Sequence, residues 1–157
     1  MVATSGLILL CSYLDSIHMA AAAAIAMEIA CVGAHMRGLP LNHQLISLEA
    51  TFVRTGNTAP CYRFYSLGPR PLLVRQMKQD DQTASIALEV WSLPIQNVGH
   101  FLQLIPSPLG LGSILLDDGS TVKGFIGEAY AAETEGAVEI TRFGGWRAFL
   151  ESKESIP

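Results

Sequence analysis

Charged side chains are scarce in this chain of 157 residues, where they make up 15% of the sequence, and no lysine or arginine occurs before Arg37. The apolar stretch SGLILLCSYL therefore has no positive flank of the kind that precedes a signal-peptide core. Asp15 and His18 interrupt the apolar run, which falls well short of the roughly 20 residues that cross a bilayer. We expect no membrane partner. Residues 1–27 are predicted to be a helical or flexible leader outside the core, and residues 28–157 to form the domain.

Cysteine is also rare. Cys11, Cys31 and Cys61 are an odd number without a CxxC pair, which favours a reduced, cytoplasmic protein. The set of Cys31, His35, His43 and Cys61 has none of the spacings that are typical of zinc sites. We therefore expect neither a metal ion nor another cofactor.

The few charges are unevenly distributed. The formal net charge of −4 argues against nucleic acid as a partner. Residues 117–139 contain six acidic side chains and one lysine, whereas residues 29–79 contain one acidic side chain and six basic ones. The six are Arg37, Arg54, Arg63, Arg70, Arg75 and Lys78. This basic segment suits a small anionic ligand, and an ordinary solvated strand face accounts for it equally well.

Half of the residues are hydrophobic, which is enough for one domain with a proper core. Short apolar or alternating runs predict strands, as does the Asp118-Gly119 turn signal of a hairpin. The predicted strands cover residues 29–32, 45–54, 61–67, 72–74 and 84–93, followed by the hairpin. Pro94 is predicted to begin a helix that runs to about Ile105, and Thr141 to cap a final helix. This mixture predicts an α+β fold, a small mixed or antiparallel β-barrel with flanking helices.

The segment VGAHMRGLPLN follows the first predicted strand. A structural turn does not need its histidine and arginine, whereas an anion-binding loop uses both. Gly33 allows a ligand to approach the backbone closely. The N–H groups from Gly33 through Ala34 to Met36 can form a concave site for an oxyanion. Asn42 is expected to close this loop by a hydrogen bond.

Six ordered segments carry a resemblance to a known family. IACVGAHMRGLPLNHQL resembles the first strand and loop of the gamma-glutamyl cyclotransferase-like fold. More narrowly, residues 28–151 resemble the C-terminal domain of allophanate hydrolase. The segments are the GAHMRGLPLN loop, APCYRFYSL, EVWSLP, IPSPLGLG, VKGFIGEA and ITRFGGWRAFL.

The resemblance implies a role in urea breakdown. Allophanate hydrolases release ammonia from allophanate in an amidase domain and leave N-carboxycarbamate. In some members the C-terminal domain is thought to decarboxylate this product, and in others its role is thought to be structural. The chain has no GGSSGG stretch, so the resemblance implies a detached domain without amidase activity that acts beside an amidase partner. The segment FLQLIPSPLGLG lacks the acidic residue of true cyclotransferases, so we expect no cyclotransferase activity.

Decarboxylation requires the nitrogen of the substrate to accept a proton. His35 is the expected donor, because its side chain titrates near neutral pH. Glu128 either orients the histidine, acts as the acid itself, or pairs with an arginine. Arg63 or Arg75 is expected to bind the charge of the dianion. Tyr62 is either a hydrogen-bond donor to the substrate or a core aromatic residue.

Two functions therefore remain open at this point. One is an enzyme domain that binds a small dianion and breaks down N-carboxycarbamate. The other is a non-catalytic module that holds amidase subunits together. A homodimer is compatible with both.

Overall fold

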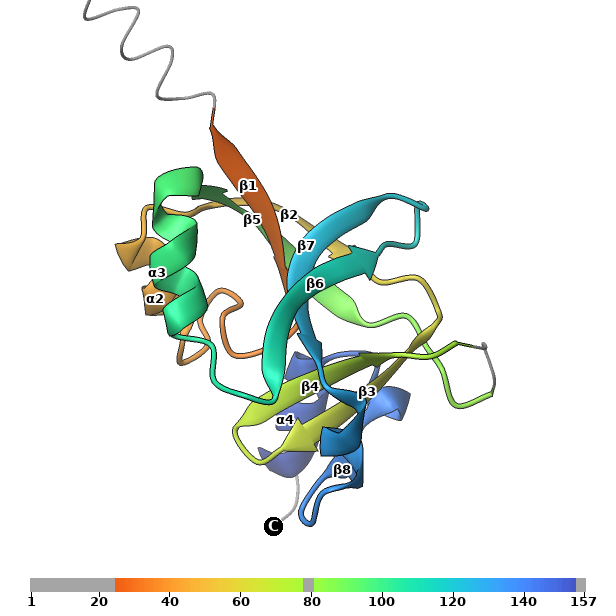
Figure 1. The fold of residues 1–157 in the computed structure, drawn as a ribbon. Coiled ribbons are helices and arrows are strands. Elements are labelled where there is room, and N and C mark those ends of the chain that lie inside the picture. Colours follow the sequence, from red (N-terminus) through yellow and green to blue (C-terminus); the bar gives the residue numbers. More distant parts are fainter. Residues whose placement is uncertain (1–24, 78–80, 155–157) are drawn as a thin grey trace, which may run out of the picture.

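The chain folds around two β-sheets. The computed structural model describes residues 25–77 and 81–154, and Figure 1 shows the arrangement of its helices and strands. The larger sheet has the order β2 (Thr51–Asn57), β5 (Ala87–Pro94), β1 (Ala26–Cys31), β7 (Thr121–Gly127) and β6 (Leu109–Leu115). The smaller sheet has the order β4 (Arg70–Arg75), β3 (Tyr62–Leu67) and β8 (Val138–Glu139).

The central strand of the larger sheet is β1. It pairs antiparallel with β5 and parallel with β7, so it has a neighbour on both edges. Its last three residues, Ile29, Ala30 and Cys31, are fully buried. The loop that follows β1 therefore begins inside the fold, because the strand end that it extends is covered on all sides.

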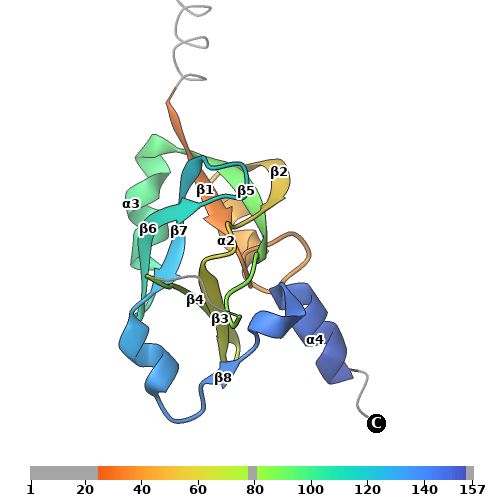
Figure 2. The same ribbon diagram turned by 90° about the vertical axis from the view of Figure 1, so that its right-hand side faces the viewer.

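The smaller sheet packs against the end of the larger one, below it in Figures 1 and 2. β7 and β4 meet closely at Gly127, where a Cβ atom would lie 1.8 Å from Cδ1 of Leu72. Only glycine leaves room for this approach. The described residues form both helices and strands, which confirms the α+β class. Their strands form two separate sheets rather than one closed ring, so the predicted barrel is not confirmed.

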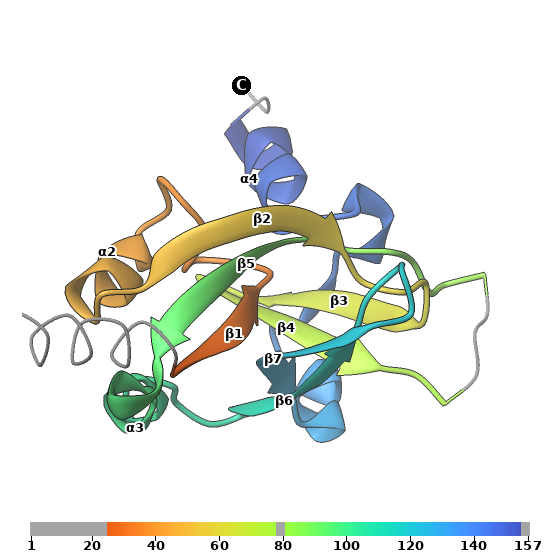
Figure 3. The ribbon, with the colours of Figure 1, turned by 90° about the horizontal axis from the view of Figure 1, so that it is seen from above.

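Short helices flank the sheets. Helix α2 (Asn42–Ser47), the 3-10 turn η1 (Ile95–Asn97) and helix α3 (Val98–Gln103) lie on one side of the larger sheet (Figure 3). The 3-10 turns η2 (Ala129–Glu133) and η3 (Thr141–Phe143) and helix α4 (Trp146–Glu154) complete the described elements. Helix α4 packs on β3 through Trp146 and Phe64, whose ring centroids are 6.3 Å apart. No helix within the described residues has the length and apolar character needed to cross a membrane.

Three predicted element boundaries are wrong. The strand predicted over residues 45–54 is helix α2 in its first part, and β2 begins only at Thr51. The chain reverses between them at Glu49, whose φ of 61° lies in the left-handed region that favours glycine. Pro94 ends β5 instead of opening a helix, and α3 stops at Gln103. Thr141 lies in a 3-10 turn, where its Oγ1 accepts a hydrogen bond from Phe64 N at 2.9 Å.

The predicted boundary between leader and domain falls inside β1. Ala26 and Met27 already pair with Pro94 and Leu93, so β1 begins two residues before residue 28. The rest of the predicted leader, residues 1–24, lies outside the described residues.

Candidate functional site

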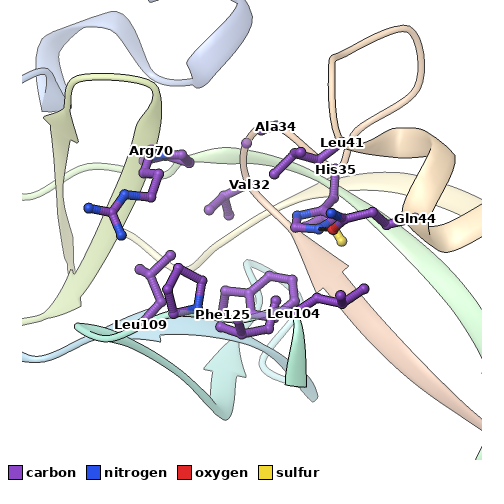
Figure 4. Close-up of a pocket in the computed structure, with 14 residues that line it drawn as sticks. Val32, Ala34, His35, Leu41, Gln44, Arg70, Leu104, Leu109 and Phe125 are labelled. Atoms are coloured by element: carbon purple, nitrogen blue, oxygen red, sulfur yellow. Dashed lines mark hydrogen bonds between the residues drawn. The ribbon is translucent and has the colours of Figure 1, made fainter. Parts of the chain in front are cut away.

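The loop after β1 forms one wall of a cavity of about 260 Å³ (Figure 4). The loop folds back on itself, because Met36 N donates to Gly33 O at 2.8 Å and Leu41 N donates to Ala34 O at 2.9 Å. Asn42 Nδ2 donates to His35 O at 2.9 Å, as its predicted closing role requires. Gly33, Ala34 and His35 all line the cavity. A cavity therefore lies at the predicted loop, but Met36 N is already used within the loop, and binding of an oxyanion by the loop amides stays a prediction.

Gly33 is required by packing against the smaller sheet. A Cβ atom at this position would lie 1.9 Å from Cγ of Pro71 in β4, another residue of the cavity wall. The small residue therefore permits the contact between the loop and the second sheet. Gly33 is thus needed for packing within the fold, whereas the sequence predicts it for the close approach of a ligand.

His35 is buried between aromatic rings, with 9% of its surface exposed. Its ring meets Phe101 of α3 edge-on at 5.2 Å and stacks on Phe125 of β7 at 5.4 Å. His35 Nε2 lies 2.8 Å from Gln44 Oε1. Burial lowers the pKa of His35, because the rings replace the water that would stabilise the imidazolium, and the hydrogen bond to Gln44 opposes this shift only in part.

The uncharged form of His35 is consequently the resting form at neutral pH. With Nε2–H donating to the Gln44 carbonyl oxygen, Nδ1 carries a lone pair and can accept a proton. In this neutral form, His35 Nε2 donates to Gln44 and Nδ1 can accept a hydrogen bond.

Arg70 is the basic side chain of the cavity wall. It is the one lysine or arginine among the described residues that line the cavity, and it is half-buried. Figure 4 shows it across the cavity from His35 and Gln44. Its Nη1 donates to Ser107 O at 3.3 Å. Arg70 belongs to the basic segment of the sequence, but Arg63 or Arg75 is the arginine predicted there to bind the ligand, so this position is missed.

The arginines predicted to bind the ligand lie elsewhere. Arg63 and Arg75 belong to β3 and β4, and neither lines the cavity. Tyr62 is fully buried, and its hydroxyl accepts a hydrogen bond from Leu115 N at 2.9 Å, an arrangement typical of a core aromatic residue. Glu128 is exposed beyond the end of β7 and borders a different hollow.

Met36 lies on the side of the loop away from the cavity, where the loop contacts the buried carboxylate of Glu89. Glu89 of β5 is 4% exposed. It accepts hydrogen bonds from Arg37 N at 2.8 Å, Arg37 Nε at 3.3 Å, Arg147 Nη2 at 3.1 Å and Trp91 Nε1 at 3.3 Å. We call Glu89, Arg37 and Arg147 the Glu89 clasp. It joins the loop to β5 and α4, and no local sequence signal marks it.

Comparisons with known proteins match this architecture. Residues 27–151 match the family model of the allophanate hydrolase C-terminal domain. The chain belongs to this family. It is 40% identical to the urea amidolyase of Saccharomyces cerevisiae over 131 residues, which are 80% of this chain and 7% of that protein. The chain thus spans only a small part of the curated relatives that it matches.

Solved structures agree with the family assignment. An allophanate hydrolase from Kluyveromyces lactis is 38% identical with a TM-score of 0.76, over 82% of this chain and 21% of that one. A uropathogenic E. coli-specific protein is 33% identical with a TM-score of 0.73, over 80% of this chain and 96% of that one. A mouse AIG2-like protein is 15% identical with a TM-score of 0.50, over 67% of this chain and 78% of that one. This likeness shows the gamma-glutamyl cyclotransferase-like fold alone.

Proposed function

We propose that this allophanate hydrolase C-terminal domain binds a small carboxylic acid in the cavity and decarboxylates N-carboxycarbamate during allophanate breakdown. The observation that carries the proposal is the convergence of the family loop, His35 and Arg70 on one enclosed space. A cavity of about 260 Å³ suits a ligand of a few heavy atoms.

Each wall has a separate task in this proposal. Arg70 attracts one carboxylate to the mouth of the cavity, because a guanidinium pairs well with a planar carboxylate. The Gly33–His35 backbone faces the substrate from the strand end. His35 moves the proton that the leaving nitrogen needs, and its lowered pKa keeps Nδ1 able to accept and return that proton.

The proposed partner is an amidase. Urea amidolyase and the K. lactis allophanate hydrolase are much longer than the matched region, since it covers 7% and 21% of them. In contrast, the matched region is 96% of the E. coli chain. These lengths support a domain that works either within a longer polypeptide or beside a separate one that supplies its substrate.

A coupled assay tests this proposal. An amidase-only partner is given allophanate with and without this chain, and release of CO₂ and ammonia is followed. The chain should accelerate CO₂ release but leave the amidase step unchanged. His35→Ala should lower the rate about a hundredfold or more, since a positioned proton-transfer group contributes about that much. His100→Ala, on the exposed face of α3, is the matched control. Full activity of His35→Ala would contradict the proposal.

A second function is favoured by exposed apolar side chains near the start of β1. Ile25 precedes β1, Ile46 lies on α2, Ile95 on η1, Leu102 on α3 and Leu104 directly after it, and all five are exposed. Ile95 N donates to Ile25 O at 3.1 Å, so two of them adjoin. Exposed apolar side chains that cluster are typical of protein interfaces. As an interaction module, the chain should bind the amidase partner even when the His35→Ala variant is used, and Ile95→Lys should abolish that binding in analytical ultracentrifugation.

A further inference from the structure

We infer that the cavity selects an acid with one negative charge and an uncharged polar group at its other end, in preference to an acid with two negative charges. This inference rests on the proposed function and names the substrate form that the site takes.

The cavity wall carries a single positive charge. Arg70 is its one basic side chain among the described residues, and the rest of the wall is largely apolar. The apolar members include Val32, Leu41, Leu104, Ile105, Leu109 and Phe125. A carboxylate placed near Arg70 is neutralised by the guanidinium. A second carboxylate at the far side would lose its water without gaining an opposite charge, which is strongly unfavourable.

The far side of the cavity is polar but uncharged. His35 and Gln44 face Arg70 across the space and are joined by the 2.8 Å contact between Nε2 and Oε1. The stacked Phe125 and the edge of Phe101 keep water away from the imidazole. This pair can exchange hydrogen bonds with an amide or a protonated carboxyl group, but it supplies no charge for a carboxylate.

The selected form has a chemical consequence. N-carboxycarbamate with one end protonated is ⁻O₂C–NH–COOH. When its acid proton passes to the nitrogen, directly or by way of His35 Nδ1, the bond between that nitrogen and the protonated carboxyl carbon can break. The electron pair of the bond stays on nitrogen, and the products are CO₂ and carbamate, ⁻O₂C–NH₂. A site that holds the singly charged form thus holds the form that is ready to lose CO₂.

Two probe molecules test the charge preference with the full chain. Malonate replaces the substrate nitrogen by carbon and carries two negative charges at pH 7.5, and its monoamide, malonamate, carries one. Isothermal titration calorimetry should show that malonamate binds at least about tenfold more tightly than malonate. A tenfold difference in Kd corresponds to about 1.4 kcal/mol, a small part of the cost of burying an unpaired carboxylate. Arg70→Gln should weaken the binding of both probes.

A designed reversal sharpens the test. Gln44→Lys places a second positive charge beside His35 and should reverse the preference, so that malonate binds more tightly than malonamate. Ser47→Lys adds the same charge to the exposed side of α2, away from the cavity wall, and should leave the preference as it is in the unmodified chain. Circular dichroism spectra of both variants confirm that each is folded.

The outcomes separate this inference from the proposed function. Equal or tighter binding of malonate by the unmodified chain, or the same shift in both lysine variants, would overturn the charge preference while leaving the cavity as a binding site. No binding of either probe, together with no effect of the chain in the coupled assay, would overturn both.

Discussion

The two faces of the loop after β1 hold their buried polar side chains in opposite ways. On the outer face, the Glu89 carboxylate accepts four hydrogen bonds, three of them from Arg37 and Arg147. On the inner face, which lines the cavity, His35 has one side-chain hydrogen-bond partner among the described residues, Gln44. A polar group whose partners are complete stabilises the fold, whereas one with an unused nitrogen beside an open space is available for chemistry.

The comparison predicts that the outer face matters most for stability. Glu89→Gln should lower the free energy of unfolding by about 2–4 kcal/mol, because it removes a buried carboxylate that accepts from two cations and two N–H groups. Urea unfolding followed by circular dichroism measures the change. Glu133→Gln, at an exposed position, is the control and should change stability by less than about 0.5 kcal/mol.

Gly33→Ala tests the packing of the loop on the smaller sheet. The added Cβ would collide with Pro71, so the loop or β4 must move, at a cost of about 1–3 kcal/mol in unfolding free energy. Gly99→Ala in α3 is the matched control, because a Cβ there meets nothing within 4 Å. If both variants unfold at the same urea concentration, the contact between Gly33 and Pro71 is not rigid.

The inner face should make stability depend on pH. The pKa of His35 is lowered from 6.5 in the folded chain, chiefly by burial, so the unfolded chain binds more protons just below pH 6.5. The free energy of unfolding should therefore fall as the pH drops from 6.5 towards the lowered pKa. His35→Gln should flatten this part of the profile, measured by urea unfolding at a series of pH values.

Neighbouring groups on the inner face need a separate control. Cys31 and Arg70 also line the cavity, and His43 lies on α2. The charge of His43 contributes the smallest of the three causes that shift the pKa of His35. His43→Gln should accordingly remove only a minor part of the effect that His35→Gln removes. An equal loss in both variants would place the titration at the surface.

The smallest expected effect concerns one arm of the Glu89 clasp. Arg147→Met removes the 3.1 Å ion pair with Glu89 and the 2.6 Å hydrogen bond from Arg147 Nη2 to Arg37 O, but Glu89 keeps its two contacts from Arg37. Because the Arg147 side chain is 45% exposed, water compensates for much of the loss, and stability should fall by about 0.5–1 kcal/mol. A loss as large as that of Glu89→Gln, measured under the same conditions, would show that Arg147 rather than Arg37 holds the carboxylate.

Several elements can be predicted from local pattern alone. The alternation of Ile86, Leu88 and Val90 predicts β5, and the Asp118-Gly119 turn predicts the hairpin of β6 and β7. Helix α2 cannot be predicted in the same way, because its apolar residues also fit a strand that continues into β2. The reversal at Glu49 uses a left-handed residue without a glycine to mark it.

The loop and its histidine also follow from local sequence, and the catalytic role of His35 stays a prediction. The side chains that contact His35 do not follow from local sequence. Gln44 is nine residues away, and Phe101 and Phe125 come from α3 and β7. Arg70 lines the cavity, whereas Arg63 and Arg75 do not. The packing of β4 on the loop decides which arginine lies there, and local sequence does not reveal that packing.

The sequence by itself determined the family, the order of most strands and the place of the loop, because these depend on side-chain types at short spacings. The tertiary structure decided the charge of the site. Whether His35 is an imidazolium or a neutral ring depends on how much water reaches it, and rings distant in sequence exclude that water. The saturation of Glu89 has the same origin, since its partners come from the loop, β5 and α4 and meet only in the folded chain.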